Sequence, residues 1–229
     1  VTCSGFAPKR EKEMSELHVI EHGTVVVTDG IISHVLRPGE PVPVNEMEYE
    51  ILDGTGKALL PGFVDPHTHF VFGGYREEEF SWRMRGDSYM DIMNRGGGIV
   101  NTTRATREAS EEELFEAGCQ RLDAMIRLGI TTVEGKSGYG LDRETELKQL
   151  RVMRRLNSEH PMDVVPTFMG LHATPAEWKG REDEFIDFNI REMLPLVAQE
   201  QLAEFADIFC EKNVFTIEQS RRYLQAARE

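Results

Sequence analysis

Three polar residues alternate at the end of one apolar segment of the sequence. Asp65, His67 and His69 occupy every second position in PGFVDPHTHF, residues 61 to 70. Alternate side chains of a strand point to one face, so a strand here directs a carboxylate and two imidazoles toward one point. At the end of a buried strand, such a cluster costs desolvation free energy unless it is paired. We therefore predict that His67 and His69 bind a metal ion and that Asp65 orients an imidazole.

Two later segments also place polar side chains directly after predicted strands. In KSGYGLD, residues 136 to 142, Tyr139 stands between two glycines, which directs its phenol into the space that the loop covers. An ordinary turn with Asp142 capping the next helix explains the glycines but not the aromatic residue. His172 in GLHATP follows the next strand, where a packed histidine and a functional one are equally good interpretations.

Arg76 and a run of glycines lie between the first two of these segments. Arg76 is seven residues beyond His69, close enough to reach back over a metal site. A surface ion pair with one of Glu77 to Glu79 is the ordinary alternative. The run Gly96 to Gly98 lacks the lysine and serine pattern of a phosphate-binding loop, and we interpret it as a mobile loop over the site.

The elements that must position these residues follow a repeating β/α pattern. The apolar segments that predict strands are residues 60–66, 130–135, 164–169 and 205–210. Ser110 with Glu113, and Thr216 with Gln219, have the spacing of helix capping boxes. Repeated β/α units indicate a parallel sheet, either open or closed into a barrel. Polar residues after each strand favour the barrel, whose active site lies at that edge.

The first 58 residues have a different pattern. TVVVTDGIISHVL, residues 24 to 36, places two β-rich segments around Asp29-Gly30 and predicts a hairpin. A second β-like stretch covers residues 49–60. We therefore predict part of a small β-sandwich domain over residues 1–58. Residues 59–229 then form the first four β/α units of a TIM-like barrel, about half of the whole.

Composition narrows the classes of function. The chain of 229 residues has a formal net charge of −14, which argues against a nucleic-acid partner and is most simply explained by solubility. No apolar run has the length of a membrane span, and three scattered cysteines favour a reducing cytoplasm. Val1 is not a translation start and the sequence stops inside the helical pattern RRYLQAARE, so we expect a piece of a longer protein.

Several motifs point to a known family. PGFVDPHTH after a small β domain resembles the amidohydrolase superfamily of metal-dependent hydrolases on a distorted TIM barrel. Within it, HTHFVFGGYREEEF, TTVEGKSGYGLDRETELKQLRV and GLHATP resemble the imidazolonepropionase family of histidine degradation, and the resemblance covers nearly the whole chain. It implies that His67 and His69 bind one transition metal, zinc or iron. It implies that Arg76, Tyr139 and His172 bind the substrate.

The resemblance also implies a reaction. A metal-activated water hydrolyses 4-imidazolone-5-propanoate to N-formimidoyl-L-glutamate, which Tyr139 also contacts, in a cytoplasmic homodimer that acts on this small molecule alone. His172 has a catalytic role, because with the metal it stabilises the developing oxyanion. Further metal ligands and the general acid and base lie beyond residue 229, so the chain alone is expected to be inactive. As a departure from the family pattern, Gly135 stands where a β-branched residue is expected, which predicts looser packing.

Two other interpretations remain open. A dinuclear hydantoinase- or dihydroorotase-like hydrolase bridges two metals with a carboxylated lysine from the fourth strand, where this chain offers only Lys212. A non-catalytic fragment that binds small molecules or a partner subunit needs no stoichiometric transition metal. Metal content therefore separates an enzyme from a binding fragment.

Overall fold

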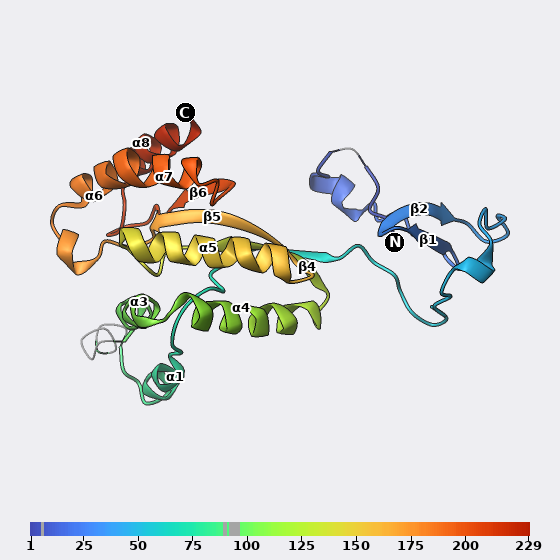
Figure 1. Cartoon of the computed structure of the whole chain (residues 1–229), viewed down its shortest axis with the longest axis horizontal. Coiled ribbons are helices and arrows are strands. Elements are labelled where there is room, and N and C mark those ends of the chain that lie inside the picture. The colour runs from blue at the N-terminus through green and yellow to red at the C-terminus, as the bar shows by residue number, and fades with distance from the viewer. Residues whose placement is uncertain (6, 89–90, 92–96) are drawn as a thin grey trace. The chain divides into compact units, whose positions relative to one another are not determined.

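The computed structural model describes residues 1–5, 7–88, 91 and 97–229 (Figure 1). The chain divides into two compact units, Val1–Gly62 and Phe63–Glu229. Each unit is described by itself below.

The first unit is built around the predicted hairpin. Strands β1 (Thr24–Thr28) and β2 (Ile31–Leu36) pair antiparallel. The turn residues Asp29 and Gly30 both have positive φ, 51° and 78°, as the tight turn of a two-residue hairpin requires. Two short 3-10 helices, η1 (Glu11–Ser15) and η2 (Glu46–Glu48), complete the regular structure of this unit. Val26 is its one buried hydrophobic residue among those described.

The prediction of a second β stretch over residues 49–60 is wrong. The described chain has a turn at Thr55-Gly56 there, where the N–H of Thr55 donates to Asp53 Oδ1 at 2.9 Å, and no strand. Ile51 and Leu52 are 71% and 82% exposed. A β-rich sequence forms a strand only where a neighbour completes its hydrogen bonds, and no described strand pairs with this segment. The unit contains a two-stranded sheet, so the expected β-sandwich is not confirmed.

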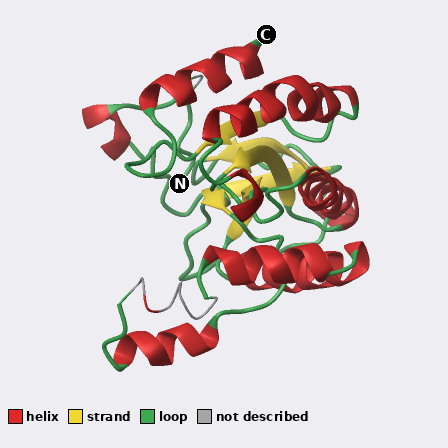
Figure 2. Ribbon diagram, turned by 90° about the vertical axis from the view of Figure 1, so that its left-hand side faces the viewer, coloured by secondary structure: helices red, strands yellow, loops and turns green. Residues whose placement is uncertain are grey.

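The second unit has a parallel sheet with helices around it (Figure 2). Its four strands, in spatial order, are β3 (Phe63–Thr68), β4 (Ile130–Lys136), β5 (Asp163–Leu171) and β6 (Phe205–Ile208). The four predicted strands are confirmed, although the first begins at Phe63 rather than at residue 60. Each strand pairs with the next one in the sequence, as in the first part of a TIM-like barrel. The fold class is thus a mixed α/β half-barrel.

Helices connect the strands. Their bounds are α1 (Glu77–Met84), α3 (Ile99–Glu108), α4 (Glu111–Ile126), α5 (Arg143–Glu159), α6 (Glu182–Phe188), α7 (Leu194–Gln199) and α8 (Ile217–Arg228). A short 3-10 helix η3 (Ala176–Trp178) precedes α6, and a π-helical turn η4 (Asn189–Met193) joins α6 to α7. Both predicted capping boxes are present, at the starts of α4 and α8. No described helix has the length and apolar character needed to span a bilayer.

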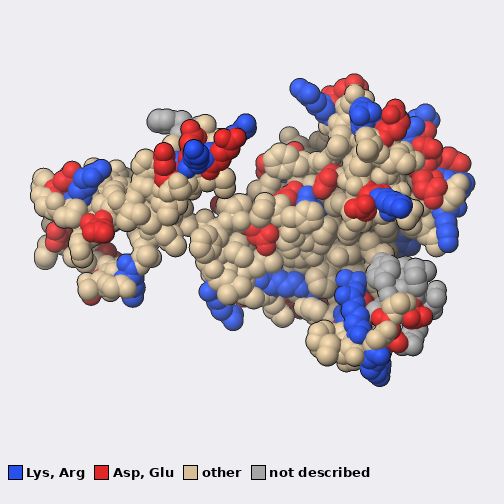
Figure 3. All heavy atoms as spheres, turned by 180° about the vertical axis from the view of Figure 1, so that it is seen from behind, with Lys and Arg blue, Asp and Glu red and all other residues tan. Residues whose placement is uncertain are grey.

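The core of this unit lies between α5 and the sheet. One apolar face of α5 is buried: Leu147 is 4% exposed, and Leu150, Met153 and Leu156 are 0% exposed. Removing one such side chain from water stabilises the fold by about 1.5–3 kcal/mol. On the outside, acidic and basic side chains are interspersed on the face in Figure 3, and several form ion pairs, such as Arg151 with Glu200 at 2.8 Å.

Strand β3, which leads into the pair His67 and His69, is exposed and is not the buried strand that the sequence predicted. Phe63 and Val64 of β3 are 54% and 61% exposed. The cause is its position, since β3 is the edge of the sheet and pairs with β4 alone among the described strands. An apolar strand sequence shows that burial is favourable, but not which neighbour supplies it.

Candidate active site

Four of the predicted site residues form one cluster of rings at the carboxyl ends of neighbouring strands. The rings of His67 and His69 are 5.8 Å apart between centroids. His69 stacks on His172 at 4.4 Å, with 10° between the ring planes. Tyr139 lies 5.2 Å from His69 and 5.3 Å from His172. Residues from three separate strand ends therefore meet, because parallel strands deliver their carboxyl ends to the same edge.

His69 has the properties of a metal ligand. It follows β3 directly, and its buried Nδ1 makes no hydrogen bond with the described residues. Burial lowers the pKa of His69 to about 3, and the positive charges of protonated His172 and His67 act in the same direction. The ring is therefore neutral at physiological pH and offers a lone pair, as metal binding requires. An unpartnered buried nitrogen beside a second histidine fits a metal ion.

The other polar groups near this pair do not complete a ligand set. His67 is exposed, and Asp65 accepts the backbone N–H of His67 at 3.3 Å rather than an imidazole N–H. The expectation that Asp65 orients an imidazole therefore finds no hydrogen bond in its favour. His172 is stacked nearly parallel to His69, so its nitrogens do not converge with those of His69. Within the described part of the chain, no three potential ligands form a metal-binding group.

The hydrogen bond of His172 defines its tautomer. Nδ1 lies 2.9 Å from the carbonyl oxygen of Gly138, which can only accept, so Nδ1 carries the proton. Burial lowers the pKa of His172, and the ring is neutral with Nε2 as an acceptor. Gly138 has φ of +111°, and a Cβ there would come within 2.8 Å of His172 Cβ. Only glycine permits this close approach of the Tyr139 loop to the histidine.

Tyr139 reaches the cluster as the sequence predicted, and Asp142 caps α5. The N–H of Thr145 donates to Asp142 Oδ1 at 2.8 Å. Burial raises the pKa of Tyr139, while the positive charge of Arg76 acts against this shift. The phenol is therefore protonated at physiological pH and acts as a hydrogen-bond donor. The interpretation as a turn with a helix cap is confirmed, and the substrate role of Tyr139 stays a prediction.

Arg76 forms an ion pair with Glu79, the ordinary alternative, and its place over a metal site stays a prediction. Arg76 directly precedes α1, and its Nη1 lies 3.9 Å from Glu79 Oε2. Its positive charge also acts to lower the pKa of Tyr139. Glu79 is buried and accepts the N–H of Gly98 at 2.6 Å, which ties α1 to the end of the glycine run. The first part of that run, Gly96, lies outside the described residues, while Gly97 and Gly98 are buried.

The segment after His69 is anchored by α4 and its neighbours. Arg121 Nη1 donates to the carbonyl oxygens of Phe70 at 2.7 Å and of Phe72 at 3.0 Å. Its guanidinium also lies 3.7 Å from the centre of the Phe72 ring, a cation–π contact. The N–H of Gly73 donates to Thr106 Oγ1 at 3.0 Å. These contacts fix the path of the chain from His69 toward Arg76.

A buried charge network beside the rings was missed by the sequence reasoning. Lys136 is 4% exposed and donates to Glu134 at 2.8 Å and to Asp207 at 3.0 Å. Burial disfavours the charged lysine, but these hydrogen bonds outweigh it and raise the pKa of Lys136. Thr167 donates to the same Glu134 oxygen at 2.6 Å. Glu134 and Lys136 alternate at the end of β4, the same pattern that identified His67 and His69, and this signal could have found them.

Gly135 does not loosen the packing, contrary to the expectation from the sequence. A Cβ on Gly135 would meet Phe70 Cε1 at 2.7 Å and Met153 Sδ at 3.0 Å. The ring of Phe70, directly after His69, fills the space that a β-branched side chain would take. Glycine is therefore required here by its neighbours.

Comparisons with known proteins agree with the motifs. The chain is 60% identical over 230 aligned residues to the imidazolonepropionase of Clostridium tetani, 57% to that of Parabacteroides distasonis and 56% to that of Bacteroides thetaiotaomicron. The resemblance to imidazolonepropionase is confirmed. The alignments cover 100% of this chain and 55–56% of each relative, so the chain spans about half the length of the curated relatives it matches. No family model matches the chain.

The imidazolonepropionase resemblance leaves the dinuclear alternative with little support. Lys212, its required lysine, is exposed beyond β6, where its backbone N–H donates to Glu211. Lys136 is buried near the histidines, but its ammonium group already pairs with the side chains of Glu134 and Asp207. Neither lysine is placed as a free bridging ligand.

Proposed function

We propose that the whole protein hydrolyses 4-imidazolone-5-propanoate to N-formimidoyl-L-glutamate. The observation that carries this proposal is the meeting of His67, His69, Tyr139 and His172 in one ring cluster. The cluster is found in a chain that is 54–60% identical to the imidazolonepropionases it matches.

His67 and His69 would hold one transition metal ion, zinc or iron. Neutral imidazoles suit both metals. When bound, such an ion lowers the pKa of a coordinated water toward neutrality and so makes a nucleophile available. The Nδ1 atom of His69, which is buried and has no hydrogen-bond partner among the described residues, supports a site of this kind.

The other site residues bind and orient the substrate. The planar guanidinium of Arg76 suits the propionate carboxylate, with which it forms two parallel hydrogen bonds. The protonated phenol of Tyr139 donates a hydrogen bond, and Nε2 of His172 accepts one from a ring N–H. To stabilise the developing oxyanion by donation, His172 first takes up a proton at Nε2.

The reaction itself is a balanced hydrolysis. Water adds to the ring carbonyl carbon, the adjacent carbon–nitrogen bond breaks, and the departing nitrogen receives the proton. The carbonyl becomes the new carboxylate of the product. We place this activity in the cytoplasm and in a homodimer of the whole protein, with a small molecule as substrate.

The direct test follows the imidazolone chromophore. The full chain loaded with zinc or iron removes it, and Tyr139→Phe slows the reaction without unfolding the protein. Tyr49→Phe, in the first unit, serves as the matched control and leaves the rate unchanged. A wild-type rate equal to that of the metal alone refutes the proposal, and a normal rate for Tyr139→Phe reduces that residue to a packing role.

Residues 1–229 by themselves provide a second test. They carry two histidine ligands, whereas a catalytic zinc site usually has three protein ligands and one open position. We expect this piece to bind metal weakly and to be inactive. Turnover above a metal-only blank would show that another group completes the site. The absence of any stoichiometric metal in the full chain would instead favour a binding protein.

A further inference from the structure

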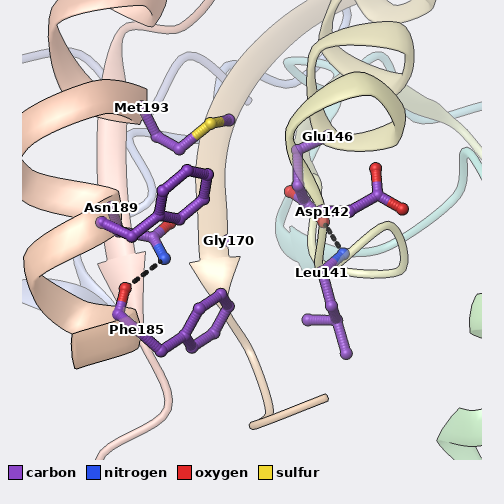
Figure 4. A pocket seen from close by; sticks show the side chains of 8 residues that line it. Leu141, Asp142, Glu146, Gly170, Phe185, Asn189 and Met193 are labelled. Carbon is purple, nitrogen blue, oxygen red and sulfur yellow. Dashed lines mark hydrogen bonds between the residues drawn. The ribbon is translucent and has the colours of Figure 1, made fainter. Parts of the chain in front are cut away.

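A buried carboxyl group from α5 lies inside the loop that carries Tyr139. Glu146 Oε1 accepts backbone N–H groups from Gly138 at 3.1 Å, Gly140 at 2.8 Å and Leu141 at 2.9 Å. Glu146 is 2% exposed, and Figure 4 shows it pointing from α5 toward Leu141. A buried N–H group without a partner costs free energy, and this single oxygen accepts hydrogen bonds from three N–H groups of the loop.

Gln149, one turn further along α5, supplies the missing acceptor. Its Oε1 accepts the N–H of Tyr139 at 3.3 Å, and its Nε2 donates to the carbonyl oxygen of Val71 at 2.7 Å. Gln149 is 0% exposed. Four consecutive loop amides, from residue 138 to residue 141, are therefore bound by two side chains of one helix. The same glutamine joins this loop to the segment that follows His69.

The loop needs this support because its backbone is strained. Leu141 has φ of +55° although it is not a glycine, and Gly138 has φ of +111°. A non-glycine residue in this region is strained and persists only where its surroundings enforce it. This conformation places the Tyr139 ring in the ring cluster and the Gly138 carbonyl oxygen within hydrogen-bond distance of His172.

Keeping Glu146 buried has a clear cost. Its Oε2 has no hydrogen-bond partner among the described residues, and the neighbouring crevice between α5 and α6 is too narrow for a water molecule (Figure 4). Burial raises the pKa of Glu146, while the nearby Ser137 hydroxyl and the loop amides act against this shift. An apolar residue would fill this position more cheaply if only packing were needed.

We propose that Glu146, assisted by Gln149, is a positioning residue that holds Tyr139 in its substrate-binding place before the substrate arrives. This inference rests on the proposed function, which gives Tyr139 its ligand. Glu146 itself acts only through the loop backbone.

The test measures binding of imidazole-4-propionate, a stable mimic of the substrate, to the full chain by calorimetry. Glu146→Met removes the acceptor at similar volume and weakens binding about tenfold or more, because three buried loop N–H groups lose their partner. Glu146→Gln keeps an acceptor oxygen and restores most of the affinity. The matched control is Glu144→Met, on the exposed face of α5, which leaves the affinity unchanged. If Glu146→Met fails to fold, Glu146→Asp, whose carboxyl is one methylene shorter, replaces it.

A double-variant cycle decides whether Glu146 acts through Tyr139. In a Tyr139→Ala background, the Glu146 change weakens binding far less than it does in the wild type, since the two effects are coupled. Amide exchange at residues 138, 140 and 141 becomes about tenfold or more faster, while amides in the centre of α5 keep their protection. Additive losses in affinity, or unchanged amide exchange, overturn the inference alone. A wild type that neither binds the mimic nor consumes the imidazolone refutes the proposed function itself.

Discussion

The loop after β3 and the loop after β4 carry the two halves of the candidate site, and they are held in different ways. The β4 loop is held by α5, since its amides donate to Glu146 and Gln149, and Tyr139 is half-buried. At the end of β3, His67 is exposed and the Nδ1 of His69 has no partner among the described groups. One half is complete with the residues of this chain, and the other is not.

This difference fits the role that we propose for each half. A substrate-binding side chain gains affinity when it is fixed in advance, because less conformational entropy is lost on binding. A metal ligand can instead be ordered by the ion, whose binding free energy also contributes to folding. We infer that the geometry of the β4 loop is set by folding and that of the histidine pair by the metal.

The largest effect is expected when the metal half is removed. A His67→Ala, His69→Ala double variant of the full chain should lose its stoichiometric metal and all turnover, because both proposed ligands are gone. Metal analysis checks this, with the exposed pair His18→Ala, His22→Ala as the control that retains metal. A full equivalent of metal in the His67, His69 variant would show that other residues bind the ion.

Arg76→Lys tests the segment that extends from the metal half. Lysine keeps the charge but loses the paired hydrogen bonds to the propionate, a loss of about 1.5–3 kcal/mol, or roughly 10- to 150-fold in kcat/KM. The loss should appear mainly in KM, with the melting temperature nearly unchanged. Arg83→Lys, exposed on the same helix, is the control. An unchanged kcat/KM would mean that Arg76 serves only its ion pair with Glu79.

Gly135→Ala tests the packing between the two halves, because Gly135 of β4 lies against Phe70, which follows His69. The added methyl group collides with Phe70 and Met153, and overpacking of this kind costs about 1–3 kcal/mol of unfolding free energy. Chemical denaturation measures this change. Gly54→Ala is the control, since nothing lies within 4 Å of its Cβ position. Equal stability of the two variants would show that Phe70 moves aside without cost.

The smallest effect concerns the helix caps. Ser110→Ala and Thr216→Ala should each cost about 1 kcal/mol at neutral pH, since both remove a capping box. Hydrogen bonds from Ser110 hold the pKa of Glu113 below its ordinary value of 4.5, so that this cap is fully formed above pH 4.5 and weakens as the pH falls through the lowered pKa. Gln219 does not titrate. Unfolding curves from pH 7 to pH 3 should show the cost of Ser110→Ala shrinking and that of Thr216→Ala constant, and parallel behaviour would contradict the account.

Local patterns predicted much of this structure. The hairpin at Asp29-Gly30 and both capping boxes depend on residues a few positions apart, and the structure has all of them. The stretch over residues 49–60 was predicted as β because its composition says nothing about a partner strand. The exposure of β3 was missed for the same reason.

The site divides in the same way. Alternation at a strand end identified His67 and His69, and the structure places them beside Tyr139 and His172. The bond from Lys136 to Asp207 joins residues 71 positions apart, which no local pattern reveals. Glu146 lies close in sequence to the loop that it holds, but its spacing is also that of an ordinary polar residue in the first turn of a helix.

A nitrogen NMR titration of the whole protein with zinc tests the contrast between the two halves most directly, because it observes both in one experiment. We expect the ring resonances of His67 and His69 to shift as zinc is added, while the amide resonances of Gly138, Gly140 and Leu141 stay in place and remain protected from exchange throughout. Loop amides that are unprotected without zinc, or that shift as much as the histidine rings, would contradict this expectation.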